Sequence, residues 1–163
     1  MPTRSPTGSR RASEPPARAY AAAGDLPDLN VWIALCVDNH VHHERARRYW
    51  REEGARAIHF CRLTALGLLR LLTQPRLMGA AACSPGEAVD RYAALRALPE
   101  IRFAHEPPDC EEALLAYARA PGFVPRLWTD AYLAAFSRRG GMRLVTFDAD
   151  FERFEGLNLL TLS

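Results

Sequence analysis

The stretch GGMRLVTFDADF, residues 140–151, gives the clearest indication of the fold class. Its two glycines are a typical helix end, and they follow an amphipathic pattern through Tyr132, Leu133 and Phe136. An apolar segment from Met142 to Phe147 comes directly afterwards and predicts a strand. A helix that leads at once into an apolar strand is typical of α/β proteins.

The chain on the amino-terminal side repeats this alternation. Short apolar segments at 26–29, 57–61, 101–104 and 157–160 predict four more strands. Amphipathic segments between them predict helices over 31–37, about 40–53, and 63–72. Because strands separated by helices pair in parallel, with helices on both faces, we expect a three-layer α/β/α sandwich with a central, mostly parallel sheet.

Two capping patterns predict where later helices begin. Ser84-Pro85-Gly86-Glu87 places a capping serine, a proline and a glutamate at the spacing of a helix start, with the helix ending near Leu98. Asp109 and Glu112 repeat that spacing ahead of residues 113–118. Both patterns therefore predict helices stabilised at their amino ends.

Length and composition indicate one domain. The chain has 163 residues, of which 48% are apolar and 25% charged. Residues 1–24 are rich in Ser, Pro, Ala, Arg and Gly, so we expect a disordered tail followed by one domain over 25–163. The net charge of +2 belongs mainly to that tail, and the rest is near neutral. Nucleic-acid binding would therefore depend on local arginine clusters rather than on overall charge.

All 21 basic residues are arginines, because the sequence contains no lysine. This excludes Schiff-base chemistry and a P-loop, both of which need a lysine amine. The four cysteines form no CxxC pair, so we expect them to be reduced, and the three in apolar surroundings to be buried. No apolar run has the length of a transmembrane helix, and a cytoplasmic location is expected.

Polar residues gather where the first and fourth predicted strands end. Asp28 and Asn30 terminate the first strand, and Thr146, Asp148 and Asp150 terminate the fourth. Asp130 lies near the start of the helix that precedes the fourth strand. Ligands bind beyond the carboxyl ends of parallel strands. If these strands are neighbours, three carboxylates converge and need a cation, for which all-oxygen ligands select Mg²⁺ or Mn²⁺. Such an ion activates water and offsets phosphate charge, which points to phosphoryl-group hydrolysis.

A simpler interpretation exists for each of these acids. An aspartate at a strand end is commonly a turn or helix cap. We assign Asp25 and Asp150 to that class, and Asp130 could equally stabilise a helix dipole.

Four segments resemble PIN-domain ribonucleases of the VapC toxin type. They are DLNVWIAL (28–35), FCRLTALGLLRLLT (60–73), WTDAYLAAF (128–136) and LVTFDADF (144–151). The resemblance covers about residues 25–163. It implies a Mg²⁺- or Mn²⁺-dependent endoribonuclease that is inhibited by a VapB antitoxin and often forms a homodimer. Carried over by position, the metal-binding and catalytic residues are Asp28, Asp130 and Asp148, and Asn30 and Thr146 line the same pocket.

One position departs from the family pattern. Many PIN domains carry a glutamate in the helix after the second strand, and Gly67 stands at that place here. We interpret this as a subfamily trait with a weaker or single metal site; the alternative is an inactive PIN-like domain that binds RNA or protein. Arg62, at the end of the second strand, either meets a substrate phosphate or pairs with a structural carboxylate.

The remaining candidates are weaker. The run His40-Val41-His42-His43 invites a zinc hypothesis, but it lacks a full ligand set, so we interpret these histidines as solvated residues that cap a helix. Arg45, Arg48 and Arg51 recur at three-residue steps, as a solvated helix face or as contacts to RNA or antitoxin. Haloacid-dehalogenase-like phosphatases and receiver domains fit poorly, because both normally use a lysine.

Overall fold

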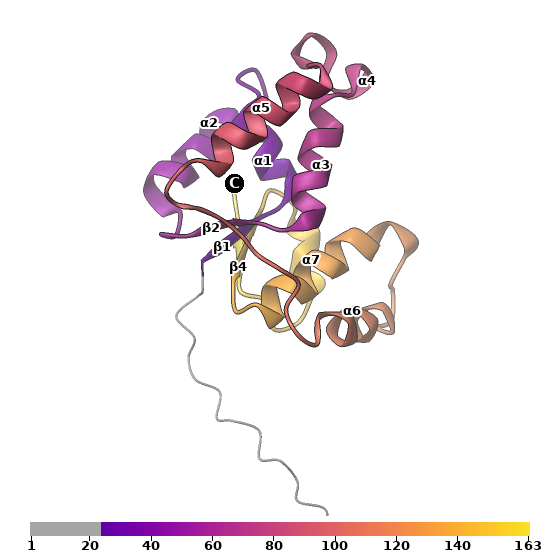
Figure 1. Ribbon diagram of the computed structural model, residues 1–163. Helices are drawn as coiled ribbons and strands as arrows, with labels where there is room; N and C mark the ends of the chain where they lie inside the picture. The colour runs from indigo at the N-terminus through magenta and orange to yellow at the C-terminus, as the bar shows by residue number, and fades with distance from the viewer. Residues whose placement is uncertain (1–23) are drawn as a thin grey trace, which may run out of the picture.

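The computed structural model describes residues 24–163 and contains a five-stranded sheet (Figure 1). Its strands are β1 (Asp25–Pro27), β2 (Ile58–Phe60), β3 (Ile101–Phe103), β4 (Arg143–Thr146) and β5 (Leu159–Thr161). They lie in the order β3-β2-β1-β4-β5, and all four pairings are parallel. The predicted α/β fold is therefore confirmed, and β1 and β4 are neighbours as the metal-site hypothesis requires.

Seven α-helices and shorter helical turns connect these strands within the described part of the chain. The α-helices are α1 (Leu29–Cys36), α2 (His43–Arg48), α3 (Arg62–Leu72), α4 (Pro75–Met78), α5 (Pro85–Arg96), α6 (Cys110–Ala118) and α7 (Trp128–Arg139). The turns are η1 (Tyr49–Glu53), η2 (Gly79–Ala81), η3 (Pro125–Leu127) and η4 (Ala149–Arg153).

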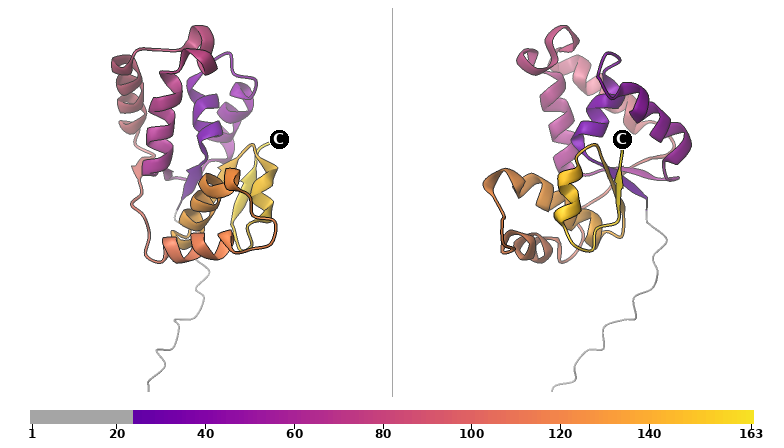
Figure 2. Two further views of the ribbon diagram at one scale, coloured as in Figure 1. Left: turned by 90° about the vertical axis from the view of Figure 1, so that its right-hand side faces the viewer. Right: turned by 180° about the vertical axis from the view of Figure 1, so that it is seen from behind.

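Helices cover both faces of the sheet, which completes the three layers. On one face α1, α3 and α5 pack against β2 and β3 around Trp32, Phe60 and Leu68. On the other face α6 and α7 pack against β1 and β4 around Leu26, Phe136 and Leu144. Figures 1 and 2 show α6 and α7 grouped apart from α1, α3 and α5.

The capping patterns in the sequence predicted some helix starts correctly and others only in part. Ser84 and Glu87 form the predicted capping box at the start of α5. Asp109 precedes α6 as predicted, but it adopts a left-handed φ of 61° and its side chain makes no capping hydrogen bond. The single helix expected over 40–53 is wrong: α2 begins at His43 and gives way to the π-helical turn η1.

Asp25 is not the turn or cap that we expected. It begins β1, is fully buried, and accepts two hydrogen bonds of 2.8 Å from the Arg143 guanidinium. Tyr49 donates its hydroxyl to the same carboxylate at 2.8 Å, and the backbone N–H of Ala55 donates at 2.9 Å. Asp25 therefore ties β1, β4 and the end of η1 together inside the core.

The disordered tail predicted over residues 1–24 lies outside the described residues, apart from Gly24. None of the helices in residues 24–163 combines the length and apolar character needed to cross a membrane. The four cysteines are free, with Cys61 and Cys110 buried and Cys36 and Cys83 half-buried.

Candidate metal site at the carboxyl end of the sheet

The strand order creates a crevice between the carboxyl ends of β1 and β4. From β1 the chain builds outward to β2 and β3, and it then crosses back to place β4 on the other side of β1. Adjacent strands whose connections leave in opposite directions open a crevice at their carboxyl ends, where ligands bind in such folds. Asp28 directly follows β1, and Thr146 ends β4.

The Thr146 hydroxyl joins the polar residues of both strand ends. It donates to Asp28 Oδ2 at 3.1 Å and accepts from Asn30 Nδ2 at 3.1 Å. The same oxygen accepts from the backbone N–H of Asp148 at 3.0 Å. Because Thr146 is fully buried, this hydroxyl fixes the side chains around it without help from bulk water.

Each carboxylate also has a local backbone partner. Asp28 Oδ1 accepts from Leu29 N at 2.6 Å at the start of α1, and Asp148 Oδ1 accepts from Asp150 N at 2.8 Å. The capping roles weighed from sequence are therefore real for these two residues. A carboxylate has about four lone-pair sites, so both retain capacity for a further ligand.

Burial, together with the negative charges of neighbouring aspartates, raises the pKa values of Asp28 and Asp130. Burial, followed by the charges of Asp130 and Asp148, raises the pKa of Asp28 to about 6, against the opposing effect of its hydrogen bonds. Burial and the Asp148 charge likewise raise the pKa of Asp130. Crowded acids of this kind are stabilised by a cation.

The donor set suits a cation that keeps part of its water shell. Among residues 24–163, no group of three or more His, Cys, Asp or Glu side chains is gathered closely enough to hold a metal ion by itself. Asp28, Asp130 and Asp148 are thus electrostatic neighbours rather than a closed cage. Mg²⁺ is commonly bound by one or two carboxylates together with waters and substrate phosphates, so this open set of oxygen donors fits it.

Replacing Thr146 by Val should lower the free energy of unfolding by about 1–3 kcal/mol. Valine keeps the shape of the side chain but removes the hydroxyl to which the partly buried polar groups around it are hydrogen-bonded. The Asp148 N–H and the Asn30 amide would be left without an acceptor. Urea unfolding, followed by circular dichroism, measures the change. Thr161→Val in β5, whose side chain is half-buried, is the matched control; an equal cost in both variants would contradict the importance of this network.

Gly67 lies where α3 approaches α1. A Cβ atom added there would come within 2.7 Å of Leu29 Cδ2, so the Leu29 side chain occupies the space that a longer residue would need. A cavity of about 260 Å³ opens beside them, lined by Asp28, Leu29, Leu63, Thr64, Leu66, Gly67, Arg70, Thr129 and Leu133. The missing glutamate is therefore replaced by an apolar wall next to Asp28.

Two arginines near the site could not be found from sequence. Arg126 forms an ion pair with Asp150 at 3.0 Å, and Arg153 lies 3.9 Å from the same carboxylate. Both arginines lower the pKa of Asp130, against burial and the neighbouring acids. The Asp150 carboxylate therefore forms ion pairs with both arginines. Arg126 is 24 residues away in the sequence, so no local spacing pattern predicts its pairing with Asp150.

Within residues 24–163, Arg62 does not pair with a structural carboxylate. It is exposed at the start of α3, and its guanidinium carbon lies 4.7 Å from the centre of the Phe103 ring. None of the ion pairs formed by residues 24–163 includes it.

The histidines meet the expectation of a solvated helix cap only in part. His42 is exposed at the position before α2, and its backbone N–H donates to His40 Nδ1 at 3.2 Å. His43 is instead buried, with Nδ1 at 2.7 Å from the carbonyl oxygen of Ala34, and the His42 ring stacks on Phe147 at 4.4 Å between ring centres. His42 makes no side-chain capping bond to α2.

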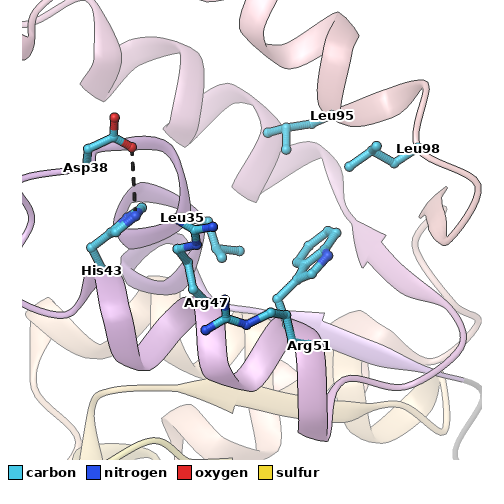
Figure 3. A pocket seen from close by; sticks show the side chains of 8 residues that line it. Leu35, Asp38, His43, Arg47, Arg51, Leu95 and Leu98 are labelled. Atoms are coloured by element: carbon cyan, nitrogen blue, oxygen red, sulfur yellow. Dashed lines mark ion pairs between the residues drawn. The ribbon is translucent and has the colours of Figure 1, made fainter.

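The three arginines of this region have different surroundings. Arg45 binds Glu53 at 2.7 Å and the Ser163 carbonyl at 2.9 Å. Arg48 is exposed, and Arg51 lines a groove. That groove, about 310 Å³ in volume, lies between α2 and α5 (Figure 3). Leu35, Trp50, Leu95 and Leu98 supply its apolar surface, and Arg47 joins Arg51 as a second cation.

Comparisons with known proteins agree on one family. The model of the PIN domain matches residues 26–157. Ribonuclease VapC41 of Mycobacterium tuberculosis is 42% identical over 144 residues, covering 85% of this chain and 98% of the relative. Ribonuclease VapC38 of the same species is 35% identical over 125 residues, covering 76% and 84%.

Two solved structures share the fold. One is M. tuberculosis VapC20, described as a sarcin-ricin loop cleaving toxin, with a TM-score of 0.63 and 21% identity over 82% of this chain and 97% of that one. The other is VapBC2 from Rickettsia felis bound to a DNA fragment from its promoter, with a TM-score of 0.60 and 10% identity over 85% and 98%.

Proposed function

The chain belongs to the PIN domain family of VapC ribonuclease toxins, and we propose that it hydrolyses RNA phosphodiester bonds at Asp28, Asp130 and Asp148 with Mg²⁺ or Mn²⁺. The observation that carries this assignment is the hydrogen-bonded link from Asp28 through Thr146 to Asp148 across two neighbouring strand ends. The 42% identity to Ribonuclease VapC41, over almost its full length, supports the reaction class.

The residues divide the work by their positions. Asp28, Asp130 and Asp148 would hold the cation, which when bound supplies water activation and charge neutralisation at the phosphate. Thr146 donates to Asp28 and so orients the carboxylate oxygen, while Asn30 holds the Thr146 hydroxyl and accepts from Phe147 N at 3.4 Å. These fixed hydrogen bonds keep the donors in place without reorganisation during the reaction.

Removing the cation should abolish cleavage. We expect the purified full-length chain to cut RNA in Mg²⁺ or Mn²⁺, to lose this activity in excess chelator, and to regain it when the cation is returned. Gel analysis of a labelled RNA measures the cut. Equal cleavage with and without chelator would contradict the metal-dependent mechanism.

We infer a VapB-like antitoxin as the inhibitory partner, as in the VapBC2 complex whose fold this chain shares. The groove between α2 and α5 fits such a partner, because a segment with apolar and acidic side chains could pack on Leu95 and Leu98 and pair with Arg47 and Arg51 (Figure 3). A homodimer, which the family resemblance implies, stays a prediction.

Reversing both groove charges should weaken inhibition. In the double variant Arg47→Glu and Arg51→Glu we expect at least about a 10-fold loss of affinity for the co-expressed antitoxin, because each contact changes from attraction to repulsion. RNA cleavage without antitoxin should be retained. Isothermal titration with Arg76→Glu on α4 as control tests this; unchanged affinity in the groove variant would place the antitoxin elsewhere.

A further inference from the structure

A cationic cluster lies at the carboxyl ends of β2 and β3. Arg62 follows β2 directly, and Phe103 ends β3, with 4.7 Å between the guanidinium carbon and the ring centre. Arg96, in the last turn of α5, extends to within 5.5 Å of the same ring centre. His105 meets the ring nearly edge-on, with 5.5 Å between ring centres. We call Arg62, Arg96, Phe103 and His105 the Phe103 cluster.

Neither positive charge of this cluster has an acidic partner among residues 24–163, because none of the ion pairs in that part of the chain includes Arg62 or Arg96. The Nη1 atom of Arg96 is buried and makes no hydrogen bond to these residues, which costs free energy for a charged donor. Arg62 is exposed. Two cations beside one ring without a carboxylate among these residues favour an anionic ligand.

The geometry suits a phosphate group. The exposed guanidinium of Arg62 lies over the Phe103 ring and leaves its N–H edges available, and such an edge matches two phosphate oxygens at once. The ring also restricts the long arginine side chains, so less conformational entropy is lost on binding. Phe103 therefore serves as a support that holds both arginines ready.

The position of the cluster connects it to the cleavage site. The sheet order places β2 between β3 and β1, and Asp28 follows β1 at the same edge. Because neighbouring strands are about 4.8 Å apart, Phe103 lies about 10 Å along this edge from the strand that positions Asp28. An RNA strand lying across the carboxyl ends would meet the Phe103 cluster on one side of the metal site.

We propose that the Phe103 cluster binds a backbone phosphate of the RNA substrate, away from the phosphate that is cleaved. This inference rests on the proposed ribonuclease function and adds Arg96, Phe103 and His105 to the substrate-binding surface. The contact carries no base information, so it positions RNA of any sequence.

RNA binding at several salt concentrations tests the proposal. The full-length Asp28→Asn variant, which keeps RNA intact, is titrated against a fluorescent single-stranded RNA with and without Arg62→Ala or Arg96→Ala. Each alanine should raise Kd by about 10-fold or more and reduce the slope of log K against log salt by about 0.7, because one phosphate contact is lost. Arg62→Lys should restore the salt slope but only part of the affinity.

Controls distinguish phosphate binding by the Phe103 cluster from a contribution to fold stability and from the proposed ribonuclease activity. Arg76→Ala removes an exposed arginine from α4, at the far end of α3, and should leave both Kd and slope unchanged. If Arg62→Ala and Arg96→Ala match this control, or lower only the melting temperature, the proposal is overturned. If instead they weaken RNA binding while the wild type fails to cleave RNA in Mg²⁺, the ribonuclease assignment fails and the phosphate site stands.

Discussion

Asp28→Asn should lower the rate of RNA cleavage by more than about 100-fold while leaving the protein folded. Even residues that only orient a metal ligand typically account for about 10- to 100-fold, and Asp28 would be a ligand itself. Asparagine caps helices as well as aspartate does, so the bond from Leu29 N can be retained. Cleavage assays and thermal melting measure the two effects.

The metal-free stability of this variant provides a second readout. In the wild type, burial and the charges of Asp130 and Asp148 disfavour the ionised form of Asp28. Removing that charge should leave the melting temperature in chelator equal or higher, whereas the stabilisation produced by added Mg²⁺ should shrink. Asp90→Asn, at an exposed position of α5, is the matched control. A variant that cleaves RNA at the wild-type rate would refute the assignment of Asp28.

Asp25→Ala should reduce the free energy of unfolding by about 3–5 kcal/mol, although Asp25 lies three residues from Asp28. Removing one partner of a buried ion pair leaves the other charge uncompensated. Here the loss of the carboxylate would remove the hydrogen-bond acceptor of the Arg143 guanidinium, the Tyr49 hydroxyl and the Ala55 N–H. Natural domains are stable by about 5–15 kcal/mol, so this is a large fraction of the total.

An exposed ion pair gives the comparison for this effect. Asp150 pairs with Arg126 at 3.0 Å, with side chains 40% and 64% exposed, and Asp150→Ala should cost no more than about 1 kcal/mol. Urea unfolding of both variants, followed by tryptophan fluorescence, measures the difference. Equal costs would mean that the Asp25–Arg143 pair contributes nothing beyond a surface contact.

The main features of the fold could be predicted because their signals are local. The helix end at Gly140 and the apolar segment after it are visible within a dozen residues, and parallel strands share one carboxyl edge. That rule predicts that Asp28, Thr146 and Asp148 lie in one region, and the hydrogen bonds between them agree.

The errors arose where long-range contacts decide the outcome. Asp25 resembles any acid at a turn until Arg143, 118 residues away, lies against it. His43 belongs to a polar run, yet packing of α2 on α1 buries it against the Ala34 carbonyl. The expected helix over 40–53 contained a π-helical turn that periodicity alone does not reveal.

The alternation of strands and helices, the acids at strand ends, and the absence of lysine, which leaves arginine as the phosphate contact, can all be seen in the sequence. The role of each aspartate and the pairing of each arginine depend on the fold. Asp25 pairs with Arg143 in the core, Asp28 lies in the crevice, and Arg62 and Arg96 lie close to the Phe103 ring. These differences arise because burial and charge pairing depend on groups brought together from distant parts of the chain.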